Sequence, residues 1–353
     1  MSFLKDLLHR KKCTRSSVLV DIAADSVAGA YAHYVQNETP VLIYVRRLPI
    51  ENKKGESHDS AMLRALEVLG NDLIREGAPV LMRATGSGRA DNILVSIDTP
   101  WQETSVRAEH FERKDPFILT KSIVDTALDK VRAVPPDKVL ADESIIGTIL
   151  NGYETRDPYG KKVHRATFIV LTSLIDKKIS DSIISTLRGL YHTKDIAHTA
   201  GSSLRYQVIR TVFPHEREAL ILDATGPITS VSLVRNGLFI ALSEIPPTEN
   251  KESWTSVVMK ELGDIVQKYP LPRTIFLLSR ELDVSSLKET LEKENIGKLW
   301  LSDNPPKIVP VVASHIIGSV RQTSDSPPDL QLLLMALYCE RCGAEKKLTM
   351  STD

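Results

Sequence analysis

The sequence predicts an α/β protein of two lobes that carries a third, inserted unit. Its 353 residues are too many for one hydrophobic core and suit two domains or one bilobed architecture. A strand that ends in an aspartate, a short turn of small residues and a second strand occur near residue 20 and again near residue 220. Two copies of this pattern suggest two related half-domains, and the stretch 100–190 between them has a different, α+β character.

The aspartates of the two copies are candidate ligands for a metal ion. Asp21 lies at the end of the apolar run 17–22, and Asp223 follows the apolar run 220–222. An aspartate at the mouth of a strand can hold a hydrated divalent cation, and the backbone N–H groups of a tight turn can bind an anion. Two such turns facing each other would clamp the phosphates of a nucleotide. For each copy taken alone, an ordinary buried strand closed by a turn is the simpler alternative.

In the first half, the expected elements follow the order β-β-β-α-β. Apolar residues recur at helical spacing from Ala61 to Ile74, and Gly77 is placed to end that helix. The four β-runs of this half lie at 17–22, 27–34, 41–47 and 92–97.

The insertion and the second half contain further periodic segments. In the insertion we expect helices near 119–133 and 179–189 and strands near 138–153 and 163–173. The second hairpin ends at Pro246-Pro247, and only one helix, at about 253–269, precedes the strand 274–278. Ser326-Pro327-Pro328 then separates the second half from a short apolar helix, 330–338, which is either the last core element or an anchor.

Composition excludes several classes of protein. Lysine plus arginine and aspartate plus glutamate number 45 each, so no global field recruits nucleic acid. The three cysteines, Cys13, Cys339 and Cys342, are too few for a disulfide framework, and a lone C-x-x-C near the end of the chain does not make a metal site. No apolar run approaches the roughly 20 residues that span a bilayer, and no secretory signal is present, so we expect a cytoplasmic protein.

The first residues form a candidate contact with a membrane or a partner. Phe3, Leu4, Leu7 and Leu8 fall on one face of a short predicted helix that ends in the basic cluster 9–12. Such a segment can lie on an anionic membrane surface, which here would be the cytoplasmic face of the inner membrane. A frayed, solubilising terminus is the alternative.

The insertion has a characteristic order of strands and turns. Its core has a strand, an Asn151-Gly152 turn, an Asp157-Pro158-Tyr159-Gly160 turn, a second long strand and a helix that begins at Ser180. This order resembles the SHS2 subdomain of the bacterial cell-division protein FtsA and of its relative PilM in type IV pilus assembly. The resemblance covers most of residues 17–245 in the same order. A generic ferredoxin-like insertion in another actin-like enzyme is the alternative.

The resemblance implies a bilobed actin-like ATPase (ribonuclease H-like) fold with an SHS2-type insertion and a reduced second lobe. It also implies a nucleotide site formed by Asp21, Ser26, Asp223, Thr225, Gly226 and Gly318. Ala23 replaces a glycine of the family pattern, and Pro227 has no backbone N–H to offer a phosphate. We therefore expect a degenerate site without a cofactor, with binding of ATP and Mg as the alternative. No competing catalytic motif or metal site is present.

The expected organisation and function follow from this resemblance. Residues 1–16 form the N-terminal segment, 17–99 with 191–215 the first half-domain, 100–190 the insertion, 216–322 the second half-domain and 323–353 the tail. We expect a non-catalytic, membrane-associated scaffold in cell division. Its partners would be cytoplasmic peptides of inner-membrane proteins or a filament-forming division protein. The alternatives are a platform protein of pilus assembly, or an active ATP-binding protein that associates with itself into polymers.

Overall fold

The structure is a computed structural model that describes residues 14–131, 134–155, 157–248, 250–294, 296–300 and 306–350. The predicted contact residues Phe3, Leu4, Leu7 and Leu8 lie outside the described residues, as do Cys13 and the side chain of Cys342. Among the described residues, no helix is both long enough and apolar enough to cross a membrane.

The first sheet contains both predicted hairpin strands of the first copy. Its order is β15-β3-β2-β1-β4-β9, with β1, β2 and β3 antiparallel to one another and β4 and β9 parallel to β1. Its central strands are almost continuously apolar because helices cover both faces of the sheet. These strands are β1 (Thr14–Ile22), β2 (Ser26–Val35), β3 (Val41–Pro49), β4 (Asn92–Ile97) and β9 (Ile196–Ala200).

The second sheet repeats this topology. Its order is β12-β11-β10-β13-β14, again with three antiparallel strands followed by two parallel ones. The repeat of the strand–aspartate–turn pattern in the sequence therefore corresponds to a repeat of the sheet. The strands are β10 (Ala219–Ala224), β11 (Thr229–Arg235), β12 (Leu238–Ile245), β13 (Thr274–Ser279) and β14 (Lys307–Val311).

Helices pack on both faces of the first sheet. Val18 and Val20 point to one face, where α2 (His58–Asp72), η1 (Leu73–Gly77), α3 (Ala78–Thr85) and α5 (Lys177–Tyr191) lie, and Leu19 points to the other. Gly77 does not end the helix as predicted. It lies inside a continuous helical segment, where an added Cβ would come within 2.9 Å of ring carbons of Tyr31 and Tyr44. Close packing against the sheet thus explains this glycine, and Gly86, in the left-handed conformation, ends α3.

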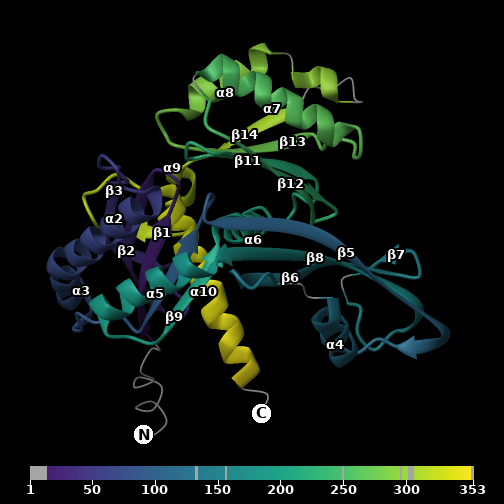
Figure 1. The fold of residues 1–353 in the computed structure, drawn as a ribbon, viewed down its shortest axis with the longest axis horizontal. Coiled ribbons are helices and arrows are strands. Elements are labelled where there is room, and N and C mark those ends of the chain that lie inside the picture. Colours follow the sequence, from purple (N-terminus) through teal and green to yellow (C-terminus); the bar gives the residue numbers. More distant parts are fainter. Residues whose placement is uncertain are drawn as a thin grey trace, which may run out of the picture.

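The second lobe is covered mainly on its outer side (Figure 1). Only α7 (Lys251–Val266) lies between β12 and β13, so the lobe is small, as the spacing in the sequence predicts. The helical elements of this lobe are α7, α8 (Val284–Lys293), the short helix η2 (Ile296–Leu299) and α9 (Ala313–Ile316).

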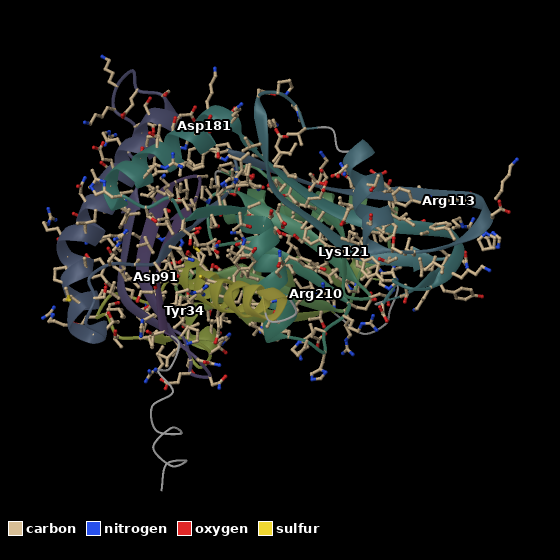
Figure 2. All side chains as sticks on the ribbon, turned by 90° about the horizontal axis from the view of Figure 1, so that it is seen from below. Tyr34, Asp91, Arg113, Lys121, Asp181 and Arg210 are labelled. Carbon is tan, nitrogen blue, oxygen red and sulfur yellow. The ribbon has the colours of Figure 1, made fainter. Side chains whose placement is uncertain are left out.

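The insertion is a four-stranded antiparallel sheet of order β5-β8-β6-β7 that projects away from the first lobe (Figure 1). Helix α4 (Lys121–Val131) packs against its outer half around Phe168. Arg113 and Lys121 mark this outer half in Figure 2. The strands are β5 (Gln102–Ile118), β6 (Lys138–Leu150), β7 (Tyr153–Glu154) and β8 (Lys162–Asp176). The sequence did not predict β5, because its middle is polar and half-exposed and therefore lacks an apolar pattern.

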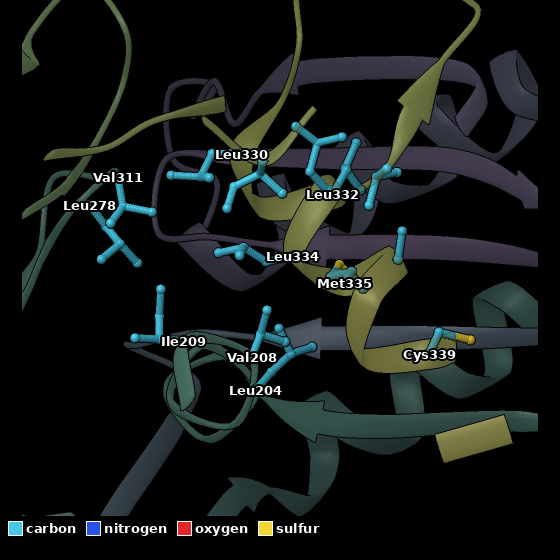
Figure 3. Close-up of a cluster of buried hydrophobic side chains, with 14 of the residues drawn as sticks. Leu204, Val208, Ile209, Leu278, Val311, Leu330, Leu332, Leu334, Met335 and Cys339 are labelled. Atoms are coloured by element: carbon cyan, nitrogen blue, oxygen red, sulfur yellow. The ribbon is translucent and has the colours of Figure 1, made fainter. Parts of the chain in front are cut away.

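The end of the chain returns to the first lobe. Strand β15 (Arg321–Gln322) pairs with β3, and α10 (Leu330–Met350) follows. Leu332 to Ala336 are buried between the first sheet and helix α6 (Gly201–Val212), as Figure 3 shows for Leu334 and Met335 beside Leu204 and Val208. Of the two alternatives for this helix, the burial supports a core element.

We expect Leu334→Ala to lower the free energy of unfolding by about 2–5 kcal/mol, because it leaves a cavity in this core. Urea denaturation measures the change. Leu282→Ala is the matched control, since Leu282 is 95% exposed and its truncation should change stability by less than about 0.5 kcal/mol. Equal effects of the two variants would show that α10 does not belong to the core.

Candidate functional site

A cavity of about 500 Å3 lies between the two lobes, where the turns after β1 and β10 meet. Of the six residues predicted to form a nucleotide site, Ser26, Asp223, Thr225 and Gly226 line it. Asp21 lies buried beside the cavity and contacts one of its lining residues. Gly318 does not line the cavity. Four of the six predicted residues thus face one space, and a fifth adjoins it.

The first aspartate is bound by an arginine of the same sheet. Nη2 of Arg47 donates to Oδ2 of Asp21 over 3.0 Å, and Nη1 of Arg47 donates to Oγ of Ser26 over 2.9 Å. Ser26 in turn donates to Oδ1 of Asp25 over 2.9 Å. Oδ1 of Asp21 has no hydrogen-bond partner among the residues that the structure describes. The serine and the aspartate predicted to hold Mg and phosphate are therefore both occupied by one guanidinium.

Arg47 also forms an ion pair with Asp329, near the end of the chain. Its Nε donates to Oδ2 of Asp329 over 2.6 Å, and its Nη2 donates to Oδ1 over 3.0 Å. Asp329 lies just before α10 and accepts the backbone N–H of Leu332 over 3.2 Å, so it caps that helix. This two-point contact fixes the planes of the guanidinium and the carboxylate relative to each other.

The second aspartate is bound by an arginine of the other lobe. Arg205, on α6, donates from Nη2 and Nη1 to the two oxygens of Asp98 over 2.7 and 3.0 Å. Its Nε forms an ion pair with Oδ2 of Asp223. All three side chains are largely buried, and Asp223 belongs to the second lobe, so this arginine clamp joins the lobes. Gly201 permits the approach, because an added Cβ would lie 2.1 Å from Oδ1 of Asp98.

The second turn is held together by hydrogen bonds between its own residues. Oδ1 of Asp223 accepts the backbone N–H of Thr225 over 3.1 Å and its hydroxyl over 2.6 Å. Gln331 of α10 donates from Nε2 to the same threonine hydroxyl. Pro227 follows in this turn and has no N–H for an anion. The turn therefore offers an anion fewer donors than a glycine- and threonine-rich loop would.

The electrostatics of the cavity do not favour a polyphosphate. Its lining contains six carboxylates and four arginines, and each of the four arginines already forms an ion pair with a carboxylate. Burial, helped by the nearby carboxylates of Asp98 and Asp329, raises the pKa of Asp21 to about 6 in spite of the opposing charge of Arg47. Burial also raises the pKa of Glu244, which accepts a hydrogen bond from Thr99 over 2.6 Å.

The residues present do not fit Mg-ATP. A magnesium ion would need carboxylate oxygens of Asp21 or Asp223, but one oxygen of each is paired with a guanidinium. The other oxygen of Asp223 accepts from Thr225, and the other oxygen of Asp21 is buried. Among the described residues, no group of three or more His, Cys, Asp or Glu side chains is arranged to hold a metal ion.

Comparison with known proteins shows the fold. No protein-family model and no curated protein matches the chain. Among solved structures, a PilM-PilN type IV pilus biogenesis complex is 13% identical, covering 94% of this chain and 98% of the other, with a TM-score of 0.57. The chain has an actin-like ATPase fold. A Bacteroides thetaiotaomicron protein of unknown function, described as having that fold, is 9% identical over 92% of this chain and 96% of its own, with a TM-score of 0.48.

Sequence reasoning missed the two arginines that define the site. One signal for Arg47 was available, because Asp21 pairs with Ala28 and Ala28 pairs with Arg47, which places the charges in one register across three strands. For Arg205 and Asp98 no local signal exists, since they lie 107 residues apart and meet only in the folded chain.

We expect Asp21→Asn to stabilise the protein at pH 7.5. A folded-state pKa of about 6 against an ordinary 3.8 means that the folded chain binds the proton more tightly, so stability falls as pH rises through this window. Ionisation of Asp21 therefore lowers the free energy of unfolding by about 3 kcal/mol between low pH and pH 7.5. The amide of the asparagine cannot ionise but can still accept a hydrogen bond from Arg47, so the variant should keep this stability. Urea unfolding from about pH 4 to pH 7.5 tests this, with the exposed Asp325→Asn as control. A variant less stable than wild type at pH 7.5 would contradict it.

Arg205→Met should lower the free energy of unfolding by about 3–5 kcal/mol, because it leaves two buried carboxylates facing each other. The control is Arg75→Met, which removes a largely exposed guanidinium and leaves Asp72 its contact with Arg46, so it should cost less than about 1 kcal/mol. Thermal or urea unfolding distinguishes the two. Similar small losses for both variants would mean that the clamp does not hold the lobes together.

Proposed function

We propose that this protein is a non-catalytic scaffold of pilus assembly that binds a cytoplasmic peptide of a membrane protein through its insertion. One observation carries the non-catalytic part. Both turn aspartates, Asp21 and Asp223, are bound by internal arginines at the place where an ATPase would hold its metal and phosphates. A chain that supplies its own cations there needs no nucleotide to hold its lobes together.

The process is proposed from the structural likeness. A structure of similar topology, which covers nearly all of both chains, is named for a complex of PilM with PilN in pilus biogenesis. This favours pilus assembly over the FtsA-like role in cell division that the sequence suggested first. By analogy, the partner would be a short cytoplasmic segment of an inner-membrane protein, and the scaffold would act on the cytoplasmic face of that membrane.

The insertion offers a surface for such a peptide. Among the described residues, three large apolar side chains on its outer half are exposed: Ile118 at 56%, Tyr153 at 80% and Tyr159 at 41%. Two of the three are tyrosines, and tyrosine is enriched at protein interfaces. The insertion projects from the lobes, so a peptide can reach it without displacing core contacts (Figure 1).

Fluorescence anisotropy with labelled peptides tests the proposal. The peptides are the cytoplasmic segments of the inner-membrane pilus proteins encoded in the same genome. The triple variant Ile118→Ser, Tyr153→Ser, Tyr159→Ser should bind at least about tenfold more weakly, because truncated hot spots each cost more than about 1 kcal/mol.

The matched control replaces three exposed apolar residues of the first lobe, Val68, Ile74 and Met82, by serine. It should bind as wild type does. If none of the peptides binds wild type, or if both triple variants bind equally well, the insertion is not the docking surface.

A further inference from the structure

The lining of the cavity between the lobes has more acidic than basic groups, with six carboxylates and four arginines. Two of these arginines bind lining carboxylates, and the other two bind Asp72 and Asp283, which do not line the cavity. Beside the cavity, Oδ1 of Asp21 is buried and has no hydrogen-bond partner among the described residues. Three of the six lining carboxylates therefore have no arginine partner, and a further acidic oxygen next to the cavity is unpaired.

The three lining carboxylates without an arginine partner are Asp25, Glu244 and Glu281. Each accepts a hydrogen bond from a hydroxyl group, and the donors in the same order are Ser26 over 2.9 Å, Thr99 over 2.6 Å and Ser314 over 2.6 Å. Among the residues that the structure describes, no lysine or arginine forms an ion pair with any of the three. A hydroxyl orients a carboxylate but leaves its negative charge in place.

These three carboxylates belong to both lobes. Asp25 lies in the turn after β1, Glu244 lies near the end of β12, and Glu281 follows β13. Within the described part of the chain, no three His, Cys, Asp or Glu side chains are grouped closely enough to hold a metal ion. A cation that pairs with all three carboxylates must therefore be extended.

The rest of the lining favours an aliphatic chain. It includes the apolar side chains of Val45, Ile228, Leu282 and Leu330. Methylene groups can lie on such a surface while an ammonium group at each end donates to a carboxylate, as the side chain of lysine does at protein surfaces. The cavity volume of about 500 Å3 falls within the range of small-molecule sites.

We propose that this cavity binds an aliphatic diamine or polyamine, whose ammonium groups pair with Asp25, Glu244 and Glu281 and whose methylene chain lies on the apolar lining. Such a ligand would contact both lobes and add to the clamp that Arg205 forms between them. The inference goes beyond the proposed function, because the peptide is expected on the insertion and the amine between the lobes.

A competing explanation makes a different prediction. Any acidic surface attracts cations, and that attraction follows the total charge and is screened by salt. In that case the position of the carboxylates and the number of ammonium groups on one chain would not matter. Variants of equal charge and amines of equal length therefore separate a built site from general attraction.

The test compares wild type with two double variants of equal charge. Glu244→Gln with Glu281→Gln removes two carboxylates of the cavity, and each glutamine can still accept from its hydroxyl. Glu289→Gln with Glu294→Gln removes two exposed carboxylates of the same lobe outside the cavity. Isothermal titration at constant ionic strength uses putrescine, cadaverine and spermidine, with pentylamine and pentanol as probes of equal length to cadaverine that carry one charge and none.

We expect wild type to bind at least one of the three amines with a Kd below about 1 mM. The cavity double variant should bind it about tenfold or more weakly, because two charge-assisted contacts are lost. The control double variant should bind it as wild type does. Pentylamine should bind about tenfold more weakly than cadaverine, and pentanol should not bind.

Three results would overturn the inference: no amine binds wild type, both double variants weaken binding equally, or pentylamine binds as tightly as cadaverine. None of them affects the peptide proposed for the insertion, which is measured separately. Urea unfolding confirms that each variant is folded. Should the cavity double variant not fold, Glu281→Gln alone takes its place with Glu289→Gln as its control, and the comparison of cadaverine with pentylamine needs wild type only.

Discussion

The guanidinium of Arg205 joins two largely buried carboxylates, Asp98 and Asp223, that come from different lobes. Carboxylates taken out of water repel each other and need a cation between them. A bound metal ion is one way to supply positive charge between such carboxylates. Here the chain supplies it itself from helix α6, so the relation of the lobes depends on a covalently attached cation that cannot dissociate.

The second arginine extends the same principle to the end of the chain. Arg47 is shared by Asp21 and Asp329, so the first turn, the edge of the sheet and the start of α10 form one charged unit. Helix α10 can supply this contact because its apolar residues are buried in the core beside α6 (Figure 3). Hydrophobic burial of α10 thus positions Asp329, and Arg47 lies between two carboxylates that would otherwise repel each other.

The two lobes are fixed to each other, whereas the insertion projects away from them. Ion pairs and core helices fix the two lobes, whereas the insertion is attached through the inner halves of β5, β6 and β8, and its outer half has its own small core around Phe168. An arm of this kind can present a binding surface at a constant distance from the lobes. The proposed scaffold role would use such a surface.

The sequence by itself determined the two related sheets, the small second lobe and the turns that carry Asp21, Ser26, Asp223, Thr225 and Gly226, because hydrophobic patterning and turn residues act over short stretches of chain. It did not reveal β5, whose exposed polar middle lacks a period, or place Gly318 outside the cavity. The tertiary structure alone decided the chemistry of the cleft. Arg47 and Asp329 are 282 residues apart, and Arg205 and Asp98 are 107 apart, so their charges meet only after the sheets, α6 and α10 have packed.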